Sequence, residues 1–178
     1  PSYSGQIITF TFPHIGNVGV NDEDIETVNM ARHAATGIVL ATDITDPSNY
    51  RSLKHFDEWL KARGIVGIAG VDTRALTALI RDHGMPNAIV AHDPEGFFDR
   101  KALAATAKAL PSMDGLDLVP GVTGTQRYDW NETIWKWNEG YGQQDAPSLH
   151  VVALDYGVKR NILRLLADRG CKVTVLPP

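Results

Sequence analysis

The chain has 178 residues, of which 43% are hydrophobic and 21% are charged, and its formal net charge is −4. This composition is typical of a soluble globular protein with one ordinary domain and part of another. The acidic balance argues against a nucleic-acid partner, which needs a basic face, and no apolar run approaches the roughly 20 residues that span a membrane.

The first 110 residues alternate β-prone and helical segments. Strands are predicted at residues 7–12, 37–44, 65–69 and 87–91, and helices at residues 22–34, 53–63, 73–83 and 98–110. The strand at 65–69 and the helix after it form the clearest unit, because Asp72 and Thr73 are good helix caps and Gly84 is a good helix stop. This part of the chain is therefore expected to be a compact α/β domain.

Residues 128–137 are rich in aromatic side chains. Trp135 and Trp137 are two positions apart, which places them on one face of any strand there. These two and Trp130 pack in a core or between domains, or they form an interface patch, and the sequence leaves both alternatives open. The polar stretch at residues 138–148 reads as a linker, so a domain boundary is predicted in it.

Residues 149–178 are predicted to form a strand, a helix and a second strand. Val151 to Leu154 are an apolar run, as in a strand buried on both faces, and Asp155 and Gly157 turn the chain into a helix that Gly170 ends. A unit of this size buries too little apolar surface to be stable alone. The chain is therefore expected to be cut off inside a second domain.

Few residues are attractive candidates for chemistry on spacing alone. The six histidines show no metal-ligand spacing, and the single cysteine, Cys171, follows a helix-ending glycine without an adjacent base, so structural roles are favoured for both types. The segment 159–161 starts a helix after a strand, where it either faces a ligand or is solvated. A nucleotide- or flavin-binding protein is a further hypothesis, although the glycine fingerprints are absent.

Arg74 is notable because it is predicted in the first turn of a helix. A cation there opposes the helix dipole and should have an anionic partner. The two candidates are the neighbouring Asp72 and an acidic surface on another subunit.

Four stretches, PSYSGQI, PHIGNVG, GIAGVDTRALTALIRDHG and HVVALDYGVKRNILRLLADRGC, closely resemble in order the small, glutamine-handling subunit of bacterial carbamoyl phosphate synthetase. The resemblance implies that residues 1–148 are the N-terminal domain of that subunit with a linker, lacking its first few dozen residues. Residues 149–178 would begin a truncated class I glutamine amidotransferase domain. The implied fold is a layered β/β/α domain of the swivelling type, followed by the first βαβ unit of a doubly wound α/β domain.

The resemblance also implies a function within a cytoplasmic heterodimeric ligase. The small subunit would hydrolyse glutamine and pass ammonia to a large subunit, which uses ATP and Mg²⁺ to make carbamoyl phosphate for pyrimidine and arginine biosynthesis. No cofactor is expected in this chain. The cysteine, histidine and glutamate that catalyse glutamine hydrolysis in the family are expected outside this segment, so the segment alone is predicted to be inactive. The alternative is a noncatalytic module that docks subunits.

One substrate-binding position is implied by the family's PSY motif. Its serine, which helps to hold glutamine, is Ser2 in this chain. A hydroxyl both donates and accepts hydrogen bonds, which suits the amino-acid end of a polar ligand; without the resemblance, Ser2 would be interpreted as a turn-capping residue. Arg74 and Trp135 are the residues expected to contact the large subunit.

Overall fold

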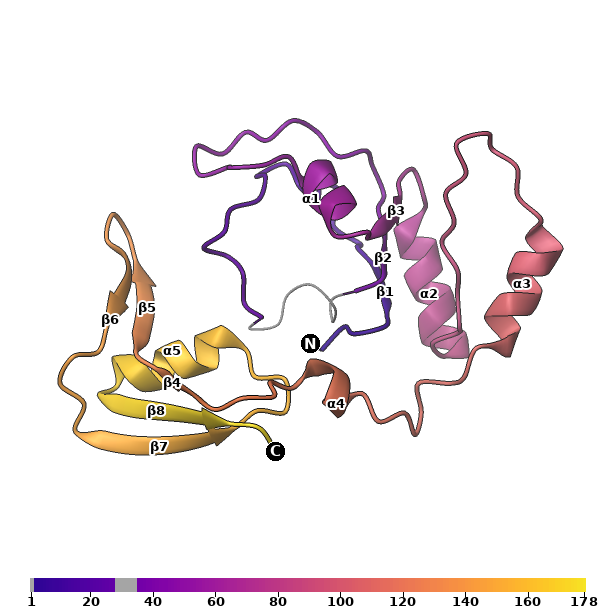
Figure 1. The fold of residues 1–178 in the computed structure, drawn as a ribbon. Helices are drawn as coiled ribbons and strands as arrows, with labels where there is room; N and C mark the ends of the chain where they lie inside the picture. Colours follow the sequence, from indigo (N-terminus) through magenta and orange to yellow (C-terminus); the bar gives the residue numbers. More distant parts are fainter. Residues whose placement is uncertain (1, 28–34) are drawn as a thin grey trace. The chain divides into compact units, whose positions relative to one another are not determined.

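The computed structural model describes residues 2–27 and 35–178. These residues divide into two compact units (Figure 1). The amino-terminal unit comprises residues 5–24 and 35–116, and the carboxy-terminal unit comprises residues 2–4, 25–27 and 117–178. The chain is thus a mixed α/β protein with small sheets, in agreement with the predicted α/β class.

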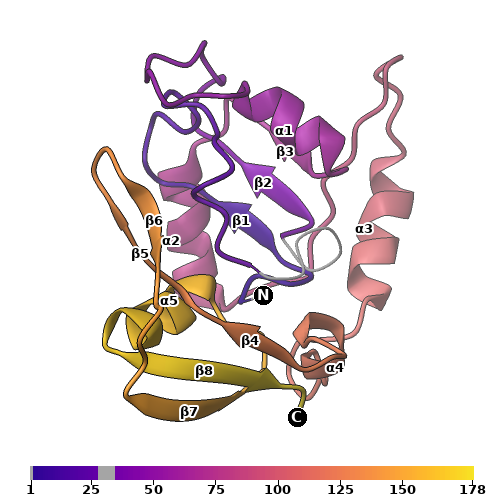
Figure 2. The same ribbon diagram turned by 60° about the vertical axis from the view of Figure 1, so that its left-hand side comes forward.

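The amino-terminal unit is built on a parallel sheet of three short strands in the order β1-β2-β3. The strands are β1 (Ile7–Thr9), β2 (Gly37–Val39) and β3 (Val66–Ile68), and Figure 2 shows β2 in the middle. Every residue of β2 is buried. Its central position explains why β2 is buried along its whole length, whereas the edge strand β3, of the same composition, has two exposed residues.

Helices α1 (Phe56–Ala62), α2 (Thr73–His83) and α3 (Arg100–Ala109) belong to the same unit. Leu60 of α1 packs against Ile38 and Leu40 to form its core. The predicted caps of α2 are confirmed: the Asp72 carboxylate accepts a hydrogen bond from the Ala75 amide, and Gly84 ends the helix with a positive φ of 84°.

Two predictions for this unit are wrong. Residues 87–91 form no strand in the described part of the chain, and the Asn87 side chain instead donates a hydrogen bond to the Leu110 carbonyl at 2.7 Å. A β-prone stretch needs a partner strand, and this one has none among the described residues. Of the predicted helix 22–34, residues 22–27 form a turn and a bridge rather than helix, and 28–34 lie outside the described residues.

The carboxy-terminal unit contains the predicted strand–helix–strand, which is confirmed. Strands β7 (Leu149–Leu154) and β8 (Cys171–Leu176) are parallel along their whole length, and α5 (Arg160–Asp168) connects them. Strand β4 (Tyr128–Trp130) pairs antiparallel with the other edge of β8, giving the order β4-β8-β7. Leu163, Val173 and Val175 are fully buried between helix and sheet.

Three further elements complete this unit. Strands β5 (Glu132–Lys136) and β6 (Gly140–Gln143) form an antiparallel hairpin, and α4 (Val119–Val122) is one short turn. The hairpin turn contains Asn138 with φ 64° and Gly140 with φ 73°, the left-handed conformation that these residue types tolerate.

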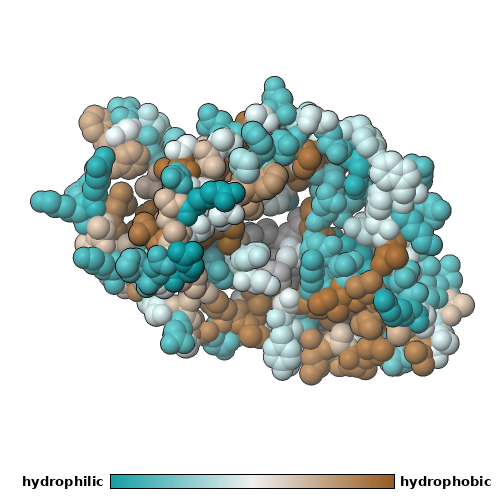
Figure 3. Space-filling view, turned by 180° about the vertical axis from the view of Figure 1, so that it is seen from behind, coloured by the Kyte–Doolittle hydropathy of each residue, from teal (hydrophilic) through white to brown (hydrophobic). Residues whose placement is uncertain are grey.

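The expectation that β7 is buried on both faces is wrong. Val152 and Leu154 are 54% and 56% exposed, whereas Val151 and Ala153 pack on the core beneath α5. Apolar surface gathers on the carboxy-terminal unit in the lower right of Figure 3. Strand β7 lies at the edge of the sheet. One of its apolar faces is left uncovered by the described residues.

Candidate functional site

The carboxyl end of β7 is organised by a buried carboxylate. Asp155 is 2% exposed, and its two oxygens accept hydrogen bonds from three backbone amides. Oδ1 accepts from Gly157 at 2.9 Å and from Val158 at 2.8 Å, and Oδ2 accepts from Gly124 at 2.8 Å. The first two bonds close the turn that was predicted from Asp155 and Gly157, and the third ties this turn to residue 124.

Two polar atoms beside Asp155 have no hydrogen-bond partner among the described residues. They are the hydroxyl of Tyr128 and Nε of Arg160, and both are buried. Burial, and then the charge of Asp155, raises the pKa of Tyr128 to about 12. The phenol is thus neutral at physiological pH and keeps a proton that it can donate.

The first turn of α5 is neither solvated nor open to a ligand at its backbone amides. The amides of Arg160 and Asn161 donate to the backbone carbonyl and the carboxylate of Glu26, at 2.8 and 2.9 Å. Sequence reasoning missed Glu26. The available signal was Lys159, which stands at the cap position of α5 but whose ammonium group cannot accept a hydrogen bond.

The three residues predicted for glutamine binding and subunit contact lie on different elements. Ser2 is an exposed residue of the carboxy-terminal unit, and Trp135 lies half-buried in β5 of the same unit. Arg74 is exposed in the first turn of α2, in the amino-terminal unit.

The alternative in which Asp72 neutralises Arg74 is not realised. Asp72 uses Oδ1 to accept from the Ala75 amide at 2.9 Å, as a helix cap does. Within residues 2–27 and 35–178, Arg74 forms no ion pair. A cation that opposes the dipole of α2 is therefore left on the surface of the described structure.

The tryptophans divide between the two alternatives. Trp130 packs against the core and donates its indole hydrogen to the Glu132 carbonyl at 2.9 Å. Trp135 and Trp137 contact each other edge to face with ring centroids 5.9 Å apart, as expected for residues on one face, and Trp137 is 62% exposed. The hairpin thus presents aromatic surface.

A cavity of about 310 Å³ is lined by the end of β4 and the start of β8. Its lining includes Trp130, Gln144, Cys171, Lys172 and Asp129. Cys171 also belongs to the buried core cluster, which agrees with the structural role predicted for it.

Three polar side chains of this sheet form a chain of hydrogen bonds. The Thr174 hydroxyl donates to Asp129 at 2.8 Å, and this bond is the main cause that lowers the pKa of Asp129. Because the hydroxyl has one hydrogen, Nε2 of His150 at 3.0 Å has to be the donor to Thr174 Oγ1. This series of hydrogen bonds therefore places a hydrogen on Nε2 of His150.

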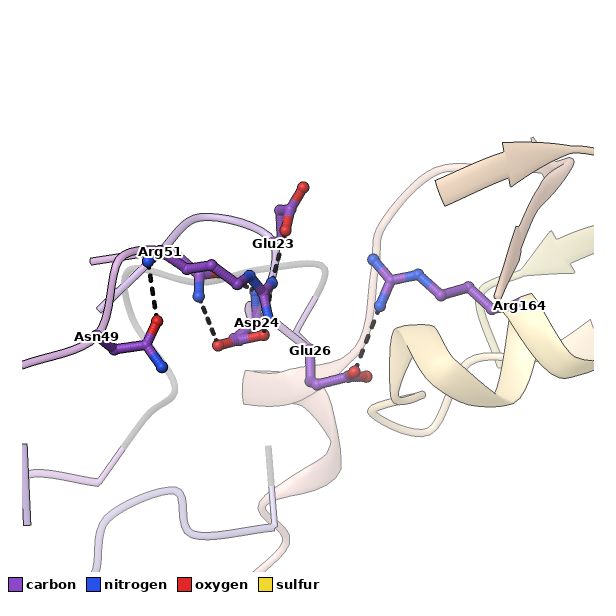
Figure 4. Close-up of polar contacts among 7 residues, drawn as sticks. Glu23, Asp24, Glu26, Asn49, Arg51 and Arg164 are labelled. Atoms are coloured by element: carbon purple, nitrogen blue, oxygen red, sulfur yellow. Dashed lines mark hydrogen bonds and ion pairs between the residues drawn. The ribbon is translucent and has the colours of Figure 1, made fainter. Parts of the chain in front are cut away.

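A separate ion pair orders the loop of the amino-terminal unit. Arg51 contacts Glu23 at 2.6 Å and Asp24 at 3.8 Å, and its amide donates to Asn49 Oδ1 (Figure 4). The hydrogen bond that Arg51 donates to Glu23 is the main cause that raises the pKa of Arg51. This contact joins residues 23–24 to residues 49–51.

Two searches of the described residues give negative results. Among them, no three His, Cys, Asp or Glu side chains come together in the manner of metal ligands. Within the same residues, no helix is both long and apolar enough to cross a membrane.

Comparison with known proteins places the chain in a family. Residues 1–90 match the model of the carbamoyl-phosphate synthase small chain, CPSase domain. Carbamoyl phosphate synthase small chains from Bradyrhizobium diazoefficiens, Rhizobium meliloti and Mesorhizobium japonicum are 65%, 64% and 62% identical to it, in each case over 99% of this chain and 45% of the relative. The chain thus spans less than half the length of these curated relatives. It belongs to the carbamoyl-phosphate synthase small chain family.

Proposed function

We propose that this chain is part of the small subunit of a glutamine-dependent carbamoyl phosphate synthetase. One observation carries the proposal: relatives bearing that small-chain name are at least 62% identical over 99% of the chain. The subunit would hydrolyse glutamine and deliver ammonia to a large subunit. That partner would use ATP and Mg²⁺ to make carbamoyl phosphate for pyrimidine and arginine synthesis in the cytoplasm.

The proposed chemistry is nucleophilic catalysis by a cysteine. A thiolate attacks the glutamine carboxamide, ammonia leaves with a proton supplied by a histidine, and water hydrolyses the resulting thioester. We place the cysteine, histidine and glutamate of this site outside residues 1–178. Cys171 does not suit the nucleophile's role because its side chain is buried in a hydrophobic core.

The exposed face of β7 supports the proposed doubly wound architecture. A parallel sheet is normally covered on both faces, yet Val152 and Leu154 are uncovered in the described structure. We propose that further strands and helices of the longer polypeptide continue the sheet beyond β7. We also propose that the amino-terminal domain is of the swivelling type and that residue 148 marks its end in the sequence, with residues 117–148 packed into the carboxy-terminal unit.

Ser2 is proposed to bind glutamine. Ser2 is exposed, so a ligand approaching the carboxy-terminal unit can reach this residue. The test uses the full-length polypeptide that contains this chain, with glutamate release as the assay. Ser2→Ala should raise KM for glutamine about tenfold, the effect of losing about 1.4 kcal/mol of hydrogen bonding.

Ser4→Ala is the matched control, because Ser4 lies in the same segment. It should leave KM unchanged. Equal effects of the two substitutions would refute the assignment of Ser2. Absence of glutamine hydrolysis by the unmodified full-length protein would refute the proposed function itself, and the chain would then be better described as a docking module.

Subunit contact is proposed at Arg74 and Trp135. Arg74 is an exposed cation without an ion pair in the described residues, which suits an acidic surface on the large subunit. A pull-down with the large subunit should be weakened by Arg74→Ala and by Trp135→Ala. Arg81→Ala is the control, since Arg81 lies on the same helix but is paired with Asp82. Undiminished binding by both variants would count against this interface.

A further inference from the structure

Helix α5 lacks a cap of its own. The residue at the cap position, Lys159, makes no capping hydrogen bond with its side chain. Of the first backbone amides of the helix, that of Ile162 is satisfied by the Lys159 carbonyl at 3.0 Å. The amides of Arg160 and Asn161 need acceptors from elsewhere in the chain.

Glu26 supplies both acceptors from a distant part of the sequence. Its backbone carbonyl accepts from Arg160, and Oε2 accepts from Asn161, 135 residues away. The next residue, Thr27, forms an antiparallel bridge with Lys159. One residue thus performs for α5 the task that a capping Asp or Ser performs within other helices. Its negative charge also lies at the positive end of the helix dipole.

Arg164 fixes the other oxygen of Glu26. Its guanidinium contacts Glu26 Oε1 at 3.3 Å, as Figure 4 shows, and donates to Glu132 Oε1 at 2.7 Å. The Arg164 side chain is only 2% exposed, and its guanidinium lies 3.7 Å from the ring centre of Tyr141. A buried guanidinium requires anionic partners, so Arg164 also holds Glu26 in place.

We propose that Glu26 is a positioning residue, which holds the start of α5 and therefore the loop of residues 155–159 at the carboxyl end of β7. In open α/β sheets, ligands bind at this end of the strands. The fixed helix start follows from the contacts of Glu26 alone. Its consequence for glutamine hydrolysis rests on the proposed function.

Amide hydrogen exchange in the full-length protein that contains this chain tests the positioning directly. Glu26→Ala removes the acceptor for Asn161 but leaves the backbone carbonyl that serves Arg160. Exchange at Asn161 should therefore accelerate about tenfold, the factor expected for one lost hydrogen bond, and exchange at Arg160 should accelerate less. The Val173 amide in the core strand β8 reports global unfolding and should change little.

Glu23→Ala is the matched control, because Glu23 lies three residues earlier and pairs with Arg51 instead. It should leave Asn161 unaffected. Unchanged exchange at Asn161 in Glu26→Ala, or an equal acceleration at Val173, would overturn the proposal. If Glu26→Ala does not fold, Glu26→Gln is used; it keeps one acceptor oxygen and should give a smaller acceleration with the same local pattern.

A kinetic measurement on the full-length protein tests the consequence for the reaction. Glu26→Ala should lower kcat/KM for glutamine on the order of 10- to 100-fold, as misplacement of a site by about 1 Å does, while Glu23→Ala stays near the parent value. If the parent does not hydrolyse glutamine, the proposed function fails and the exchange result is unaffected. If the parent is active and Glu26→Ala is equally active, the positioning role in catalysis is refuted.

Discussion

Helices α3 and α5 begin in opposite ways. Helix α3 is capped by the residue directly before it, since Asp99 accepts hydrogen bonds from the amides of Lys101 and Ala102. Helix α5 is capped by Glu26, from a segment more than a hundred residues earlier. The first helix carries its start signal in its own sequence, whereas the second acquires its start only when the carboxy-terminal unit has folded.

The difference extends to how the two helices are stabilised. No residue of α3 is buried, but Leu163, Arg164 and Ala167 of α5 are. Helix α3 therefore depends on local capping and on its alanine-rich composition, and α5 depends on tertiary contacts. Substitutions at these contacts should distinguish stabilisation by local capping from stabilisation by tertiary contacts.

The largest effect is expected at Arg164. Arg164→Ala removes the buried cation and leaves Glu26 and Glu132 without their common partner, so the carboxy-terminal unit should lose about 3 kcal/mol of unfolding free energy. Urea denaturation followed by tryptophan fluorescence measures it. Arg169→Ala, at the end of the same helix, should cost less than about 1 kcal/mol because Arg169 is exposed and bonds only the Leu165 carbonyl. Similar losses in the two variants would mean that the buried ion pairs contribute nothing specific.

A smaller effect should come from giving α5 a local cap. Lys159 has φ −79° and ψ 133°, a conformation that an N-cap residue adopts. In the Glu26→Ala background, Lys159→Asp should restore about 1 kcal/mol of stability, because its carboxylate can accept from the freed Asn161 amide. In the parent it should add little, since Glu26 already fills this role. A failure of Lys159→Asp to restore stability to Glu26→Ala would show that Glu26 does more than cap α5.

Asp99→Ala, which removes the cap of α3, should cost about 1 kcal/mol of unfolding free energy.

The effect that is smallest at neutral pH concerns Tyr128 and appears only in alkali. Its pKa is raised to about 12 by burial, so the folded state holds the phenolic proton more tightly than the unfolded state, whose tyrosines have a pKa near 10. The stability that this provides is complete below pH 10 and is lost as the pH rises from 10 through about 12. Tyr128→Phe should flatten this loss.

Absorbance at 295 nm provides the measurement. At pH 11, Tyr128→Phe should absorb nearly as much as the folded parent, because the missing tyrosine is mostly un-ionised there. In denaturant the same variant should absorb less than the parent by one tyrosine. A full one-tyrosine deficit in the folded variant would contradict the raised pKa.

The sequence was sufficient for elements whose signals are local. Asp72 and Gly84 mark the ends of α2, and Gly170 marks the end of α5, because caps act within a few residues. The sequence was insufficient where a distant pairing partner decides whether a segment forms a strand. Residues 87–91 have strand-forming side chains but no strand to pair with in the described structure.

The candidate site shows the same division. The turn at Asp155 was predicted because an aspartate bonds amides two and three residues ahead, whereas its bond to Gly124 was not. Glu26 falls within the helix that was predicted at residues 22–34. Its true partners, Asn161 and Arg164, lie at separations of 135 and 138 residues, for which the sequence carries no periodic signal.

The position of Cys171 has an experimental consequence. It is the single cysteine of the chain, it is 6% exposed, and it sits in the cluster with Leu163 and Val173 beneath α5. Because Cys171 lines the cavity beside β4, part of its labelling by a thiol reagent can proceed in the folded state, and the part of the labelling rate that rises with denaturant reports the opening of the carboxy-terminal unit. The unmodified chain thus carries a built-in probe, at one defined atom, of the very packing on which α5 depends.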